Sequence, residues 1–127
     1  MALNNNNRPV FLDLTRIHLP VTAVLSIAHR LAGVLLFLFI PLSIYLLQRS
    51  LRDAQGFQSV VATLGHPGWR ALLIMLIWAF AHHLFAGLRF LLLDIEVGVD
   101  RDRSRHSAWL VIIAGIAMTL FASVCLV

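Results

Sequence analysis

The apolar run from Ala71 to Leu93 is the feature that most constrains this chain, because it is long enough to cross a bilayer as an α-helix. About 20 predominantly apolar residues suffice for such a span. Two adjacent histidines, His82 and His83, lie near the middle of this run and are therefore expected to sit in hydrocarbon. An ionisable side chain at that depth is costly, so the pair marks a candidate functional site.

The composition indicates a membrane protein. Of the 127 residues, 60% are hydrophobic and 13% are charged, which is more apolar surface than a soluble domain of this size carries. All ten basic residues are arginines, and they are spread between the apolar runs, so the pattern excludes a nucleic-acid interface. The single cysteine, Cys125, allows neither an internal disulfide nor a CxxC metal site. Any soluble catalytic domain is expected to come from other chains.

The fold class predicted from these patterns is an all-α membrane protein with three transmembrane helices and a short interfacial N-terminal segment. This segment covers residues 1–20, and the anchor domain covers residues 21–127, with spans at about 21–48, 71–93 and 108–127. Residues 57–64, in the first loop, predict a short interfacial helix before the breakers Gly65 and Pro67. Pro41 interrupts the first span and predicts a kink there.

The arginines also predict an orientation. The N-terminal segment and the second loop together hold five arginines, against three in the first loop. The positive-inside rule therefore places the N-terminus and the second loop in the cytoplasm, with the C-terminus outside. Arg89, near the end of the second span, is expected to snorkel toward the interface or to pair with Asp94.

The two histidines cannot serve one cofactor together, because adjacent helical residues point about 100° apart. His83 shares its face with Ala79 and Gly87, and these small residues are expected to leave room for a flat macrocycle. Haem iron takes one or two axial imidazoles, so one histidine from this chain is enough. The alternative is a histidine that only hydrogen-bonds between helices. The residues alone leave both interpretations open.

A second polar group lies near the start of the first span, where Ser26, His29 and Arg30 share one side. In an antiparallel pair of spans, at 1.5 Å per residue, Arg30 lies about 14 Å deep and His83 about 16 Å deep from the same side. The group therefore approaches the depth of His83. A haem propionate or a quinone oxygen would each satisfy Arg30. An equal alternative is that Arg30 snorkels to the headgroups while Ser26 bonds back to its own helix.

Two motifs resemble one family. Arg8-Pro9-Val-Phe-Leu-Asp13, followed by Ser26-Ile-Ala-His29-Arg30-Leu-Ala-Gly33, resembles the N-terminal signature of the succinate dehydrogenase cytochrome b subunit. Residues 83–94 resemble its second signature, His-x3-Gly-x-Arg-x4-Asp. Motif order, motif separation and the three-span layout also match, so the resemblance covers nearly the whole chain. The chain departs from the pattern at Phe90, where many members carry histidine.

The resemblance implies one of two small membrane anchors of succinate:quinone oxidoreductase (complex II). His83 then matches the axial ligand of a haem b shared with the second anchor. His29 and Arg30 match positions near the haem propionates, and Ser26 and Arg30 match the ubiquinone site. The other implied partners are an iron–sulfur subunit and a flavoprotein that oxidises succinate, so this chain carries no succinate-oxidising site. The implied location is the bacterial cytoplasmic (inner) membrane.

Two alternatives remain from the sequence. One is the anchor of a fumarate reductase that works with menaquinone. The other is a haem-free structural anchor or small transporter subunit, in which His83 only joins helices.

Overall fold

The computed structural model describes residues 18–126, and the part of the N-terminal segment before His18 lies outside the described residues. Within this range the chain is all helical: α1 (Val21–Ser50), α2 (Ala54–Gly65), α3 (Pro67–Asp94) and α4 (Arg101–Leu126). Three of these helices, α1, α3 and α4, are long and apolar enough to cross a membrane. The predicted fold class is therefore confirmed for the described residues.

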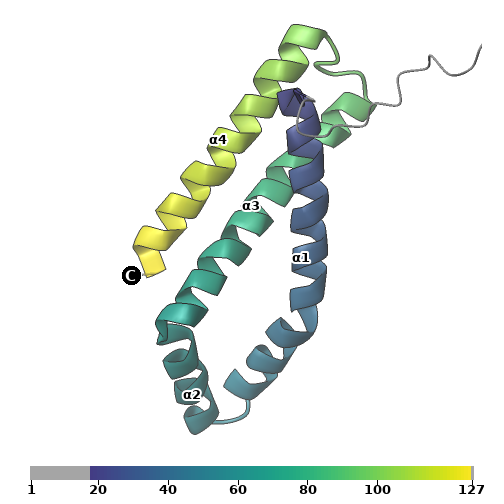
Figure 1. The fold of residues 1–127 in the computed structure, drawn as a ribbon. Coiled ribbons are helices and arrows are strands. Elements are labelled where there is room, and N and C mark those ends of the chain that lie inside the picture. Colours follow the sequence, from purple (N-terminus) through teal and green to yellow (C-terminus); the bar gives the residue numbers. More distant parts are fainter. Residues whose placement is uncertain (1–17, 127) are drawn as a thin grey trace, which may run out of the picture.

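Helix α3 lies between α1 and α4, and α2 closes the far end of the α1–α3 pair (Figure 1). Small side chains make these contacts possible, because they let helix backbones approach closely without a thick layer of side chains between them. The buried residues include five alanines that are at most 1% exposed; they are Ala32, Ala79, Ala81, Ala86 and Ala108. Leu25 of α1 is the large side chain that fills the centre of this packing.

Helix α1 begins after Pro20 and continues through Pro41 to Ser50. A proline inside a helix leaves the carbonyl four residues earlier without its helical hydrogen bond, which allows a bend. The axis of α1 bends in its second half, toward α2 (Figure 1). Only 6% of the apolar window of α1 is buried in the chain, so most of its side chains face outward to lipid or to another subunit.

The predicted short helix is present as α2, but it begins earlier, because Asp53 caps it by accepting a hydrogen bond from the Gly56 N–H (2.6 Å). His66 separates α2 from α3 and caps α3 through Gly68, with Pro67 at the first helical position. Helix α3 therefore starts before the expected Ala71.

The connection between α3 and α4 is shorter than the sequence predicts, since α4 begins at Arg101 and not at Ala108. Helix α3 ends in a Schellman motif in which the Val97 N–H bonds to the Leu92 carbonyl (2.9 Å) and Glu96 adopts a left-handed φ of 62°. Gly98 adds a second left-handed residue with φ of 78°, which turns the chain back at once. The first turns of α4 are thereby set beside the end of α3.

Candidate functional site

The histidines of two different spans meet where α1 packs on α3. The imidazole rings of His29 and His83 are stacked, with ring centroids 4.1 Å apart and planes 8° from parallel. The expected similarity in depth of His29 and His83 is therefore present in the structure. Phe90, two turns further along α3, makes an edge-type contact with the His29 ring, with ring centroids 5.2 Å apart.

A backbone hydrogen bond fixes the tautomer of His83. Its Nδ1 lies 3.1 Å from the carbonyl oxygen of His29. Because a carbonyl oxygen can only accept, Nδ1 must carry the proton and donate it, which leaves the lone pair of Nε2 available. Metal-ligating histidines commonly have this arrangement, with one nitrogen on the metal and the other donating to a carbonyl. The stacking with His29 uses the ring face, whereas a metal bonds in the ring plane, so the two contacts are compatible.

Gly33 makes the close approach of the two helices possible. A Cβ added at Gly33 would lie 2.8 Å from Cε1 of His83, closer than real Cβ contacts allow. On α3, a Cβ added at Gly87 would lie 3.6 Å from Nε2 of His29. The space beside Gly87 was expected to admit a macrocycle; in this structure the His29 ring of α1 lies next to it. Binding of a macrocycle on this face of α3 therefore stays a prediction.

Ser26 and Arg30 lie one turn apart on α1, on the side toward its N-terminal end. The Arg30 Nη2 donates to the Ser26 hydroxyl oxygen over 3.4 Å, and Arg30 is exposed. Among the described residues Ser26 makes no bond to its own helix backbone. Its oxygen is engaged as an acceptor, and its hydroxyl hydrogen remains free to donate to a ligand.

His82 has a different environment from its neighbour. It is 3% exposed, its ring stacks on Trp78 at 5.3 Å, and Gly115 of α4 packs directly against its backbone. Its Nε2 is buried without a hydrogen-bond partner in the described part of the chain. The two histidines therefore lie on different sides of α3, as their angular separation requires.

Arg89 neither snorkels nor pairs with Asp94, so that expectation is wrong. Its side chain is 5% exposed and reaches across to α4, where Nε donates to the Ser107 hydroxyl (2.9 Å). Its Nη2 donates to the carbonyl and the hydroxyl oxygen of Ser104 (2.9 and 2.8 Å). The sequence did contain a signal for this contact. Ser104 and Ser107 lie three residues apart, near the start of the last span and on the same side of the membrane as Arg89.

Within residues 18–126 there is no cluster of three or more histidine, cysteine, aspartate or glutamate side chains that could hold a bare metal ion. An axial haem site needs only one imidazole from each chain. The donor set around His83 therefore fits an axial position of a macrocyclic iron group better than a protein-only metal centre.

The fold and the site together define a class of protein: a three-span helical membrane subunit with stacked histidines between its first two spans. Residues 4–122 match the family model described as succinate dehydrogenase/fumarate reductase transmembrane subunit. This chain belongs to that family.

Individual relatives agree with the family match. The chain is 40% identical to the succinate dehydrogenase cytochrome b556 subunit of Coxiella burnetii, over 94% of this chain and 97% of the relative. It is 32% identical to the cytochrome b560 subunit of Reclinomonas americana, over 93% and 85% of the two chains. The b556 subunit of Paracoccus denitrificans is 28% identical, over 93% and 91%. The chain is therefore a membrane subunit of the succinate dehydrogenase type.

Proposed function

We propose that this chain is the haem b-binding anchor subunit of a bacterial succinate:quinone oxidoreductase. The observation that carries the proposal is the His83 imidazole, whose Nδ1 is held by the His29 carbonyl at 3.1 Å so that Nε2 is left for iron. Relatives named cytochrome b556 support the same cofactor. The second axial ligand would come from a second small anchor, and the full complex would add an iron–sulfur subunit and a flavoprotein.

The haem, when bound, supplies a one-electron carrier near the middle of the membrane. His83 binds it and holds its orientation through the His29 carbonyl. His29 and Arg30 lie on the side of α1 from which a propionate would be contacted, and the guanidinium of Arg30 provides the positive charge for it. Gly33 keeps the His83 ring close to α1, so the ligand nitrogen has a fixed position.

Ser26 and Arg30 would bind the quinone. The hydroxyl oxygen of Ser26 accepts from Arg30, so the Ser26 hydrogen is free to donate to a quinone carbonyl oxygen. Arg30 then stabilises the negative charge that develops on this oxygen during reduction. Electrons would reach the quinone from succinate through the flavoprotein and the iron–sulfur subunit. The chain would lie in the cytoplasmic membrane with its N-terminus inside.

The haem assignment is tested on the assembled complex by a reduced-minus-oxidised spectrum. Replacement of His83 by alanine is expected to remove the b-type bands while the subunits still co-purify. A normal b-type spectrum in the His83→Ala complex would contradict the ligand assignment and favour a haem-free anchor.

The quinone assignment is tested by comparing two electron acceptors. Ser26→Ala and Arg30→Ala are expected to lower quinone reduction by at least tenfold while succinate oxidation by an artificial dye is retained, since a lost ligand contact of about 1.4 kcal/mol corresponds to tenfold. Equal loss of both activities would instead indicate failed assembly. The family includes fumarate reductases, so rates with ubiquinone and menaquinone identify the physiological quinone.

A further inference from the structure

A cleft lies between the beginning of α1 and the first turns of α4, away from the histidines. Its volume is about 730 Å³. Leu19 and Val24 form part of one wall, and the opposite wall is a stripe of α4. The two helix beginnings lie at the same end of the bundle (Figure 1), so the cleft opens where the spans enter the membrane.

The α4 wall changes in chemistry along its length. Its residues are Arg101, Arg105, Trp109 and Ile112, and they follow one face of the helix at intervals of three or four residues. At 1.5 Å per residue, this order runs from charge through an amphipathic ring to an aliphatic side chain within about 16 Å. A phospholipid has the same order along its length: an anionic phosphate, a polar glycerol ester and then acyl chains.

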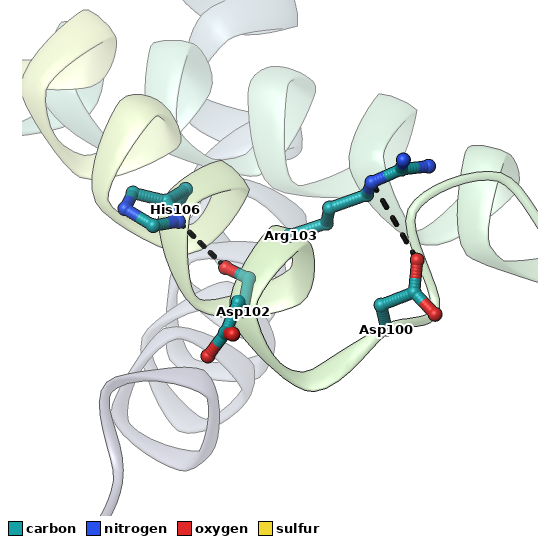
Figure 2. Close-up of polar contacts among 4 residues, drawn as sticks. All are labelled: Asp100, Asp102, Arg103 and His106. Carbon is teal, nitrogen blue, oxygen red and sulfur yellow. Dashed lines mark hydrogen bonds and ion pairs between the residues drawn. The ribbon is translucent and has the colours of Figure 1, made fainter.

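The charge in the cleft is positive. Among residues 18–126, neither Arg101 nor Arg105 has a carboxylate within salt-bridge distance. Arg103, in the same turns, pairs with Asp100 at 3.5 Å (Figure 2). Arg103 does not line the cleft. Both α1 and α4 also begin here, and helix N-termini carry partial positive charge. Asp102 is close in sequence but does not line the cleft.

We propose that this cleft binds the headgroup of an anionic phospholipid, with Arg101 and Arg105 on the phosphate and Trp109 beside the glycerol region. Basic pockets between membrane helices are suited to such headgroups, and tryptophan favours the headgroup level. The site shares no residue with the proposed haem and quinone positions, so it does not depend on them.

The test compares the wild-type assembled complex with two variants: Arg101→Gln/Arg105→Gln, which removes both charges of the cleft, and Arg103→Gln, which removes one nearby charge outside the cleft. Binding of phosphatidylglycerol and of phosphatidylcholine to the detergent-solubilised complex is measured by native mass spectrometry. A photoreactive phosphatidylglycerol with its reactive group near the glycerol locates the contact by peptide mapping. Co-purification of all subunits controls for assembly.

Each arginine near a membrane surface is worth about fivefold in binding an anionic lipid. The double variant is therefore expected to bind phosphatidylglycerol about thirty-fold more weakly than the wild type, whereas Arg103→Gln binds it normally. Crosslinks in the wild type are expected at Trp109 or Ile112.

Three results would overturn the proposal. The first is equal binding of phosphatidylglycerol and phosphatidylcholine, and the second is equal loss in Arg103→Gln and the double variant. The third concerns occupation by the N-terminal segment of this chain. If phosphatidylglycerol crosslinks to the cleft only after residues 1–16 are removed, the cleft is occupied by this segment and not by lipid.

Discussion

The two sides of α3 treat their polar residues differently. Toward α4, Arg89 gives three hydrogen bonds to Ser104 and Ser107 and is almost fully buried. Toward α1, His83 donates one hydrogen bond from Nδ1 to a backbone carbonyl and is half-buried. Its second nitrogen, Nε2, takes no part in that hydrogen bond. A polar side chain in a membrane span that is satisfied by its neighbours joins helices. One that keeps bonding capacity at an accessible position is suited to a ligand.

The sharpest test of this comparison is the pair of adjacent histidines. His83→Ala is expected to remove essentially all b-type absorbance, because it deletes the proposed axial ligand. His82→Ala deletes a buried ring that stacks on Trp78, so it is expected to lower stability by about 2 kcal/mol, as large-to-small core changes do, while haem is retained. The haem content per complex and the midpoint of thermal unfolding distinguish the two outcomes. Equal haem loss in both variants would remove the distinction between the two sides.

Arg89→Met should weaken the packing of α3 on α4 without affecting the proposed haem ligand, His83. It removes three interhelical hydrogen bonds, each worth roughly 0.6 to 1 kcal/mol in a membrane protein, so a loss of about 2 kcal/mol is expected. The measurement is thermal unfolding of the complex, with the spectrum of the surviving complex as a check on the haem. Arg103→Met, at an exposed position, is the control and should change stability little. A double-mutant cycle with Ser107→Ala would show coupling if the hydrogen bond contributes.

A pair of glycine substitutions compares the two interfaces directly. Gly33→Ala places a Cβ 2.8 Å from His83 Cε1, so the ring or α1 must shift and the haem spectrum is expected to change, with a destabilisation of about 1 kcal/mol. Gly115→Ala places a Cβ 3.6 Å from the His82 backbone, which is an ordinary contact. It is therefore expected to leave the spectrum unchanged and to stabilise α4 by about 0.5 kcal/mol. An unchanged spectrum in Gly33→Ala would argue against a position of His83 fixed by α1.

The smallest expected effect concerns Phe90, whose ring centroid lies 5.2 Å from that of His29 in an edge-type contact. Phe90→Leu keeps an apolar side chain but loses the aromatic contact, which is worth about 0.5 to 1 kcal/mol. We expect a small shift of the haem midpoint potential in a redox titration, because His29 holds His83 in place. Phe121→Leu, on an exposed face of α4, is the matched control and should leave the potential unchanged.

The sequence was sufficient for the features that depend on one segment at a time. Apolar length identified three spans, and the breakers around Pro67 located the end of α2. The angular separation of His82 and His83 correctly predicted different environments. The sequence misplaced the start of α4, because the charged residues from Arg101 onward resemble a loop although they form helical turns.

Features that depend on two segments were harder to predict. The partner of Arg89 was missed, since Ser104 comes close only after the chain reverses at Glu96 and Gly98. The position of His29 beside Gly87 could not be predicted from the residues of α3 alone. The shared depth of His29 and His83 was predictable because it needs only helix rise and antiparallel topology, whereas ring stacking depends on packing.

The hydrogen bonds of Arg89 have a consequence for biosynthesis. Its acceptors follow it in the chain by 15 and 18 residues, and ribosomes add about 5 to 20 residues per second. The acceptors are therefore synthesised roughly one to four seconds after Arg89. Since a lone arginine is costly in hydrocarbon, we expect α3 to remain at the translocon until α4 emerges. The two would then enter the bilayer together as a helical hairpin.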